Sequence, residues 1–183
     1  MNQDLKMSLD DVGIVALGSN LPGEYRSSFA LLDAAVARLP DAGFRISRLS
    51  RWWQAAAWPN RDDPDYLNGV ALVETTLTPL QALTRLLALE GEFGRVRGRP
   101  NAPRTLDLDL IALGRLVINE EGLILPHPRA HLRGFVMGPL AEVAAGWVHP
   151  ILGRTASVLA RDAPIGRDSD LNARLPNVGS HSK

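Results

Sequence analysis

Two aspartates alternate with leucines in the segment Leu106-Asp107-Leu108-Asp109-Leu110. Side chains two residues apart on a β-strand point to the same face, so both carboxylates would share one face, with their α-carbons about 6.6 Å apart. The leucines would then face the opposite, buried side. Like charges held side by side repel, and a divalent cation relieves the repulsion. Hard oxygen ligands favour Mg²⁺. Spacing alone leaves a second interpretation open, in which this is an edge strand with a solvated acidic face.

An arginine-rich segment precedes the acidic pair. Arg95, Arg97, Arg99 and Arg104 lie in a stretch that contains no acidic residue and no apolar periodicity, which predicts an exposed loop. Guanidinium groups bind phosphate oxygens through paired hydrogen bonds, so arginines placed before a metal-binding strand would form a clamp for a polyphosphate. The alternative is a solvated loop whose arginines pair with distant acids.

Composition narrows the classes of function. Hydrophobic residues make up 45% and charged residues 22% of the 183 residues, which is typical of a soluble globular protein. The formal net charge is zero, so neither nucleic acid nor a membrane surface is expected as a partner. The absence of cysteine excludes disulfides and thiolate chemistry. We expect a cytoplasmic protein, because the sequence shows neither a signal peptide nor a membrane-spanning run.

The familiar nucleotide motifs are missing. The sequence contains neither a Walker lysine loop nor a Gly-x-Gly-x-x-Gly motif after a strand, so any ATP site must be of another kind. Carboxylate-bound metal and arginines would be sufficient for phosphoryl-type transfer, which depends on positioning and charge neutralisation.

Hydrophobic spacing and turn signals predict the elements that position these residues. Strands are expected at 12–17, 44–53, 66–75 and 105–113, with short edge strands at 116–118 and 123–125. The strand at 105–113 is expected to be central. Helices are expected at 29–39, at 135–145, and after Thr78, where Pro79 and Gln81 complete a capping box.

The order strand, helix, strand, strand, helix, strand predicts an α+β fold of the ferredoxin-like kind, an antiparallel sheet covered by helices in a single domain. We expect this domain over residues 12–161. A polar N-terminal lead would occupy residues 1–11, and a polar, disordered tail would occupy residues 162–183.

Several short motifs occur together, and together they carry a resemblance. They are Gly18-Ser19-Asn20, Pro64-Asp65-Tyr66-Leu67-Asn68, Gly94-Arg95-Val96-Arg97, Pro103-Arg104-Thr105 leading into the Asp-Leu-Asp segment, Pro126-His127-Pro128, and Arg133-Gly134-Phe135. In order and spacing, over about residues 12–159, the sequence resembles the 6-hydroxymethyl-7,8-dihydropterin pyrophosphokinases of folate biosynthesis.

The resemblance implies transfer of diphosphate from ATP to the hydroxymethyl group of the pterin, with release of AMP and no covalent enzyme intermediate. Two Mg²⁺ ions would be held by Asp107 and Asp109, and the substrate's own hydroxyl oxygen would attack the β-phosphorus. Arg95 and Arg97 would be catalytic, neutralising the charge that shifts between leaving and attacking oxygens.

The resemblance also assigns residues to the two substrates. The residues expected to bind ATP are Glu90, Arg97, Arg104, Leu110, His127 and Arg133. Those expected to bind the pterin are Ala55, Ala56, Trp58, Tyr66, Asn68 and Phe135. Tyr66 and Phe135 would lie on either side of the flat ring, and Asn68 would pair with its edge. Without the resemblance, the two aromatic residues are typical of a core, and His127 is equally well explained as a capped loop histidine.

Some positions depart from the family pattern. Ala55-Ala56-Ala57-Trp58 stands where many members have Thr-Pro-Pro-Leu, so the backbone would make the pterin contacts there and Trp58 would take the place of the leucine. Leu87 and Gly122 stand where glutamine and arginine are frequent.

Two other functions remain open at this point, a non-catalytic ligand-binding module and a palm-type nucleotidyl transferase. The transferase would release pyrophosphate instead of AMP. We expect a monomer.

Overall fold

The computed structural model describes residues 8–57, 62–96 and 103–166. In chain order the elements are strand β1 (Gly13–Ser19), helix α1 (Ser28–Arg38), strands β2 (Arg45–Leu49), β3 (Trp53–Ala55) and β4 (Tyr66–Glu74), helix α2 (Pro79–Glu92), strands β5 (Asp107–Leu113), β6 (Ile118–Glu120) and β7 (Leu123–Leu125), the 3₁₀ helix η1 (Ala130–Leu132), and helices α3 (Gly134–Ala144) and α4 (Ala156–Asp162). None of the described helices is long and apolar enough to cross a membrane.

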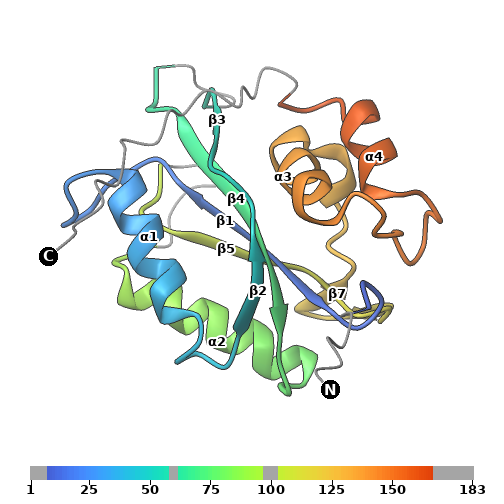
Figure 1. Ribbon diagram of the computed structural model, residues 1–183. Coiled ribbons are helices and arrows are strands. Elements are labelled where there is room, and N and C mark those ends of the chain that lie inside the picture. Colours follow the sequence, from blue (N-terminus) through green and yellow to red (C-terminus); the bar gives the residue numbers. More distant parts are fainter. Residues whose placement is uncertain (1–7, 58–61, 97–102, 167–183) are drawn as a thin grey trace, which may run out of the picture.

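A single antiparallel sheet organises these elements. Its strand order is β2-β4-β1-β5, and β3 pairs with the beginning of β4. Helices α1 and α2 cover one face of the sheet, and α3 and α4 lie against the other (Figure 1). Strands β6 and β7 form a separate hairpin. The predicted antiparallel α+β fold is therefore confirmed, and β1-α1-β2-β4-α2-β5 follows the ferredoxin-like order.

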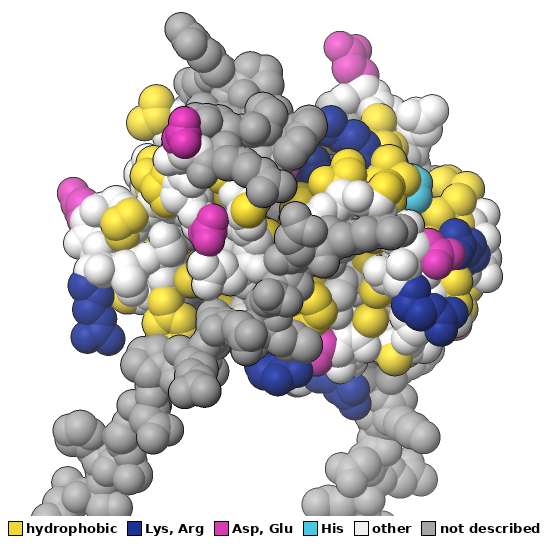
Figure 2. Space-filling model, turned by 90° about the horizontal axis from the view of Figure 1, so that it is seen from above, with side chains coloured by type: hydrophobic (Ala, Val, Ile, Leu, Met, Phe, Trp, Pro, Cys, Tyr) yellow, Lys and Arg dark blue, Asp and Glu magenta, His cyan; other side chains and the backbone are white. Residues whose placement is uncertain are grey.

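The outer surface carries charges of both signs. On the face shown in Figure 2, hydrophobic, basic and acidic side chains are interspersed, as expected for a formal net charge of zero. Ion pairs such as Arg38 with Glu92, 3.0 Å apart, have side chains that are about half exposed, and such pairs contribute little to stability. Ion pairs that are shielded from solvent are screened less than these surface pairs.

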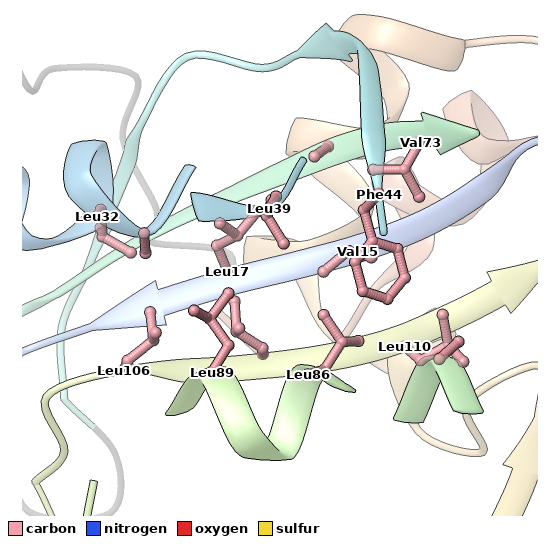
Figure 3. Packing of buried hydrophobic residues seen from close by; sticks show 14 of the residues in the cluster. Val15, Leu17, Leu32, Leu39, Phe44, Val73, Leu86, Leu89, Leu106 and Leu110 are labelled. Atoms are coloured by element: carbon pink, nitrogen blue, oxygen red, sulfur yellow. The ribbon is translucent and has the colours of Figure 1, made fainter. Parts of the chain in front are cut away.

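Helices cover both faces of β1, and all of its residues are buried. Val15 and Leu17 belong to the hydrophobic core that α1 and α2 close, whereas Ile14 belongs to the core that α3 and α4 close. Figure 3 shows Leu32 of α1 and Leu89 of α2 packing in the first of these cores. Burial of side chains of this size contributes about 1.5–3 kcal/mol each.

Helix α2 begins where the sequence predicts. The hydroxyl of Thr78 accepts a hydrogen bond from the backbone N–H of Gln81, and the Gln81 side chain accepts one from the N–H of Thr78 at 3.0 Å. Pro79 occupies the first helical position. The predicted capping box is therefore confirmed. It could be predicted because all of its interactions are local in sequence.

The strand predicted at 105–113 is at the edge of the sheet, so its prediction as a central strand was wrong. Among the described residues, β5 pairs with no strand other than β1. Its outer edge is closed by other groups. The buried carboxylate of Glu90 accepts from the N–H of Leu108 at 2.8 Å, and the N–H of His127 donates to the carbonyl of Ile111 at 2.8 Å.

The strand predicted at 44–53 is divided into β2 and β3. The division occurs at Ser50, whose hydroxyl accepts the N–H of Val70 at 2.9 Å in place of a backbone carbonyl. The adjacent ring of Trp52 packs closely over Gly69, where a Cβ would lie 2.6 Å from the ring. These tertiary contacts, unlike a capping box, leave no local pattern in the sequence.

The chain continues beyond α4 as residues 163–166, here called the return segment, which pairs with residues at the beginning of α3. The disordered tail predicted from residue 162 stays a prediction for 167–183, which lie outside the described residues.

Candidate active site

One end of the sheet face that packs against α3 is polar. Along β4, Val70 and Leu72 belong to the core beneath α3, but Asn68, on the same face, does not. Strand register places Asn68 opposite Gly18 and Gly18 opposite Asp107. Three neighbouring strands therefore form a polar floor where the apolar core ends.

Gly18 keeps this floor open. A Cβ at this position would lie 3.2 Å from Oδ1 of Asn68 and 3.8 Å from Cβ of Asp107. Any larger side chain would fill the space between these two residues. The glycine therefore leaves open the space above the polar floor between Asn68 and Asp107.

A cavity of about 330 Å³ opens at this floor. The predicted site residues that line it are Ala55, Ala56, Tyr66, Asn68, Arg104, Asp107, Arg133 and Phe135. Gly18, Arg129 and Ile165 complete the lining. An adjoining hollow of about 30 Å³ is lined by both Asp107 and Asp109. Residues predicted to bind pterin, phosphate and metal therefore meet around connected spaces.

Asp107 is the centre of a network of charges. Its carboxylate is ion-paired with Arg95 and, at 3.1 Å, with Arg104. Arg95 is also 2.5 Å from Glu90 and donates a hydrogen bond to the carbonyl of Leu106 at 3.0 Å. The side chains of Arg95, Arg104 and Asp107 are only 19–28% exposed, so solvent screens these pairs less than surface pairs. Two arginines of the predicted clamp, Arg95 and Arg104, are thus attached to the acidic strand.

Asp109 occupies a less favourable electrostatic position. Burial raises the pKa of its carboxyl, and the charge of Asp107 adds to this effect, while His127 and Arg133 act in the opposite direction. The guanidinium of Arg133 lies 3.4 Å from the Asp109 carboxylate. The repulsion expected of two carboxylates on one strand face is therefore present, and a bound cation would relieve it.

Glu90 and Leu110 lie behind the site and do not line its cavity. Glu90 is 3% exposed, and burial raises the pKa of its carboxyl to about 7, against the lowering effects of the Leu108 N–H and of Arg95. Its contacts join α2 to β5 and to Arg95. Leu110 is buried in the core beneath α2, so only its backbone remains available for the predicted ATP contact.

His127 has both a structural role and a place near the acidic pair. Its Nδ1 accepts the N–H of Arg129 at 3.2 Å, as expected of a capped loop histidine. Burial lowers the pKa of the imidazole, while the carboxylate of Asp109 raises it. The ATP contact predicted for His127 stays a prediction.

Three predicted residues, Trp58, Arg97 and Arg99, lie outside the described residues. Three cavity residues, Gly18, Arg129 and Ile165, were not predicted as site residues, although Gly18 belongs to the quoted Gly18-Ser19-Asn20 motif. Arg129 follows the Pro126-His127-Pro128 motif, so its charge and position were available signals. Ile165 carried no signal, because only the path of the folded chain brings it to the cavity.

Comparison with known proteins identifies the family. The family model described as 7,8-dihydro-6-hydroxymethylpterin-pyrophosphokinase (HPPK) matches residues 14–145. The 2-amino-4-hydroxy-6-hydroxymethyldihydropteridine pyrophosphokinase of Synechocystis is 41% identical over 143 residues, covering 78% of this chain and 71% of that protein. The enzyme of the same name from Haemophilus influenzae is 40% identical over 136 residues, covering 74% and 83%.

A solved structure agrees on the fold. The wild-type HPPK-DHPS of Plasmodium falciparum superposes with a TM-score of 0.63 at 11% identity, over 83% of this chain and 44% of that chain. This chain therefore spans less than half of that longer protein. The matched residues contain the polar floor, the acidic strand and the beginning of α3. The chain belongs to the 7,8-dihydro-6-hydroxymethylpterin-pyrophosphokinase family.

Proposed function

We propose that this chain transfers diphosphate from ATP to the hydroxymethyl group of 6-hydroxymethyl-7,8-dihydropterin, a step of folate biosynthesis, and releases AMP. The observation that carries the proposal is the cavity itself. Tyr66, Asn68 and Phe135 line it together with Arg104 and Asp107, so a site for a flat ring adjoins a site for phosphates.

The pterin half rests on Asn68. Its side chain is 8% exposed, and its Nδ2 has no hydrogen-bond partner among the described residues. An unsatisfied buried donor costs about 1–3 kcal/mol, so an acceptor on a bound ring would remove a penalty. Tyr66 and Phe135 line the same cavity, and aromatic faces suit a planar heterocycle.

The metal half rests on Asp107 and Asp109, which we propose hold two Mg²⁺ ions. Both are hard oxygen donors on one strand face, and both line the hollow of about 30 Å³. Within the described ranges no group of three or more His, Cys, Asp or Glu residues is suited to a metal. Phosphate oxygens and water would therefore complete the coordination, as Mg²⁺ prefers. When bound, the metal supplies positive charge to the phosphates.

The remaining chemistry needs position and charge. The hydroxyl oxygen of the pterin forms a bond to the β-phosphorus, the bond from that phosphorus to the oxygen shared with the α-phosphate breaks, and the hydroxyl proton leaves to solvent. Arg95, Arg104 and Arg133 surround the acidic strand, and we propose that they bind the phosphates and stabilise the charge on the departing AMP. We propose the same role for Arg97.

The test is a product analysis. Purified protein, ATP, Mg²⁺ and 6-hydroxymethyl-7,8-dihydropterin are expected to give AMP and the pterin diphosphate in equal amounts, measured by chromatography. Pyrophosphate as the product would indicate the nucleotidyl transferase instead. Folded protein that forms no AMP would overturn the proposal.

A further inference from the structure

We propose that the return segment, residues 163–166, is a specificity-determining wall of the pterin site that positions Phe135 and contacts the ring through Ile165. The inference rests on the proposed function. The family model matches residues 14–145 and therefore ends before this segment. The segment contacts the beginning of α3 and lines the cavity.

The backbone of Ile165 is attached to the beginning of α3. Its carbonyl accepts the N–H of Gly134 at 2.6 Å, and its N–H donates to the carbonyl of Leu132 at 3.1 Å. Arg133, the N-cap residue of α3, makes no side-chain cap hydrogen bond in the described structure, and the Ile165 carbonyl accepts the N–H of Gly134, one of the N–H groups at this end of the helix. The return segment thus fixes the turn from which Arg133 and Phe135 extend.

Gly166 brings the segment into contact with the aromatic ring. Its φ of +73° lies in the left-handed region, and a Cβ there would lie 2.6 Å from Cδ1 of Phe135. Gly134 allows the same approach from the other side, because its Cβ would lie 2.9 Å from the carbonyl oxygen of Gly166. The position of the Phe135 ring therefore depends on a residue without a side chain at 166.

Ile165 adds an apolar surface to the cavity. It lines the cavity together with Phe135, Ala55 and Ala56, and it is still 38% exposed. A flat heterocycle bound there would cover this side chain and gain the free energy of apolar burial. A nucleotide phosphate would gain nothing from the same contact. The wall therefore favours binding of the pterin, and not of ATP.

The first experiment compares Gly166→Ala with Gly153→Ala. Both glycines have positive φ, but a Cβ at Gly153, whose φ is +63°, meets nothing within 4 Å, so this variant carries the backbone strain without the contact. We expect Gly166→Ala to raise the Kd for the pterin, measured by calorimetry, and its KM by about tenfold or more. The KM for ATP should stay within about twofold, and Gly153→Ala should change neither constant.

A second pair tests the side chain without altering the glycine. Ile165→Ala should weaken pterin binding several-fold, whereas Ile151→Ala, in an exposed position, should not. If the unmodified chain binds no pterin, the proposed function fails and the inference with it. If the unmodified chain binds pterin and turns it over, but Gly166→Ala and Ile165→Ala match their controls, the inference alone is overturned. Equal losses for pterin and ATP would also overturn it, since they indicate a general structural role.

Discussion

At the level of single residues, the aspartate pair combines attraction and repulsion. Asp107 is ion-paired with Arg95 and Arg104, whereas burial raises the pKa of Asp109 and the charge of Asp107 raises it further. Two carboxylates held this close repel each other, and a cation and a polyphosphate that share the charges would make the arrangement favourable. We therefore propose that the two aspartates contribute to binding more than to stability.

Replacement of Asp109 tests this division. We expect Asp109→Ala to lower kcat by about 10²–10³-fold, the scale of losing one group that stabilises transition-state charge. The melting temperature should change little, because the lost carboxylate was itself destabilised by burial. The measurement is AMP formation at saturating substrates beside a thermal melt.

Asp33→Ala, at an exposed position on α1, is the matched control. A near-normal rate in Asp109→Ala would remove the metal role from this residue.

Replacement of Asn68 should lower the affinity for the pterin without lowering the stability of the fold. Asn68→Leu removes a buried amide whose Nδ2 has no partner among the described residues, so the free energy of unfolding should stay equal or increase by up to about 1–3 kcal/mol. The affinity for the pterin should fall by about 10–100-fold, because the ring loses its hydrogen-bond partner. Urea unfolding and calorimetric titration measure the two quantities. A variant that loses stability and keeps its affinity would contradict the assignment.

At the level of elements, the sequence predicted the features that depend on neighbouring residues and missed those that depend on tertiary contacts. The capping box at Thr78 and the face shared by Asp107 and Asp109 follow from neighbouring residues, so helix α2 and the acidic strand were found in the sequence. The edge position of β5 could not be predicted from the sequence, because its leucines are buried as in a central strand. Glu90, on another element, accepts the N–H of Leu108 at the outer edge of β5. The seven-residue helix α4 lacked a detectable period.

The hydrogen bond between Glu90 and Leu108, which connects α2 to β5, leads to a prediction about how stability depends on pH. Burial raises the pKa of Glu90 from 4.5 to about 7, so the folded state binds more protons than the unfolded state between these values. Stability from this site is therefore present at low pH and is lost as pH rises towards 7. Glu90→Gln keeps an acceptor for the Leu108 N–H but does not titrate.

As pH rises from 5 to 8, the unfolding free energy of Glu90→Gln should increase relative to that of the natural chain by on the order of 1–3 kcal/mol. Urea denaturation at the two pH values measures the difference. Parallel pH dependences for the two proteins would show that Glu90 is not strained by burial.

At the level of the whole molecule, the two faces of the sheet have different tasks. Helices α1 and α2 close one core, and α3 and α4 close the other (Figure 1). The second core does not include Asn68, Gly18 or Asp107, which lie side by side on neighbouring strands. The site therefore occupies the place where the second helical layer ends. Phe135 of α3 and Ile165, which follows α4, line the cavity, so this helical layer supplies part of its wall.

We expect His149 to make the stability of this second layer depend on pH. The residue is 4% exposed, and its Nδ1 accepts the N–H groups of Ile151 and Leu152, each at 3.2 Å. Burial lowers the pKa of the imidazole, and the nearby His131 lowers it further. The unfolded chain therefore binds the proton more readily, so this contribution to stability is present above the ordinary histidine pKa of about 6.5 and is lost as pH falls below it.

His149→Asn should remove that loss, because the amide oxygen of asparagine can accept the same two N–H groups and does not titrate. We expect the natural chain to lose more unfolding free energy than His149→Asn between pH 7.5 and pH 5.5. Taking the difference between the two proteins cancels contributions that they share, including that of Glu90, whose slope has the opposite sign. His131→Asn should move the midpoint of the loss to higher pH, since it relieves the neighbouring charge. If His149→Asn and the natural chain lose stability in parallel, the histidine is not the group that senses pH in this layer.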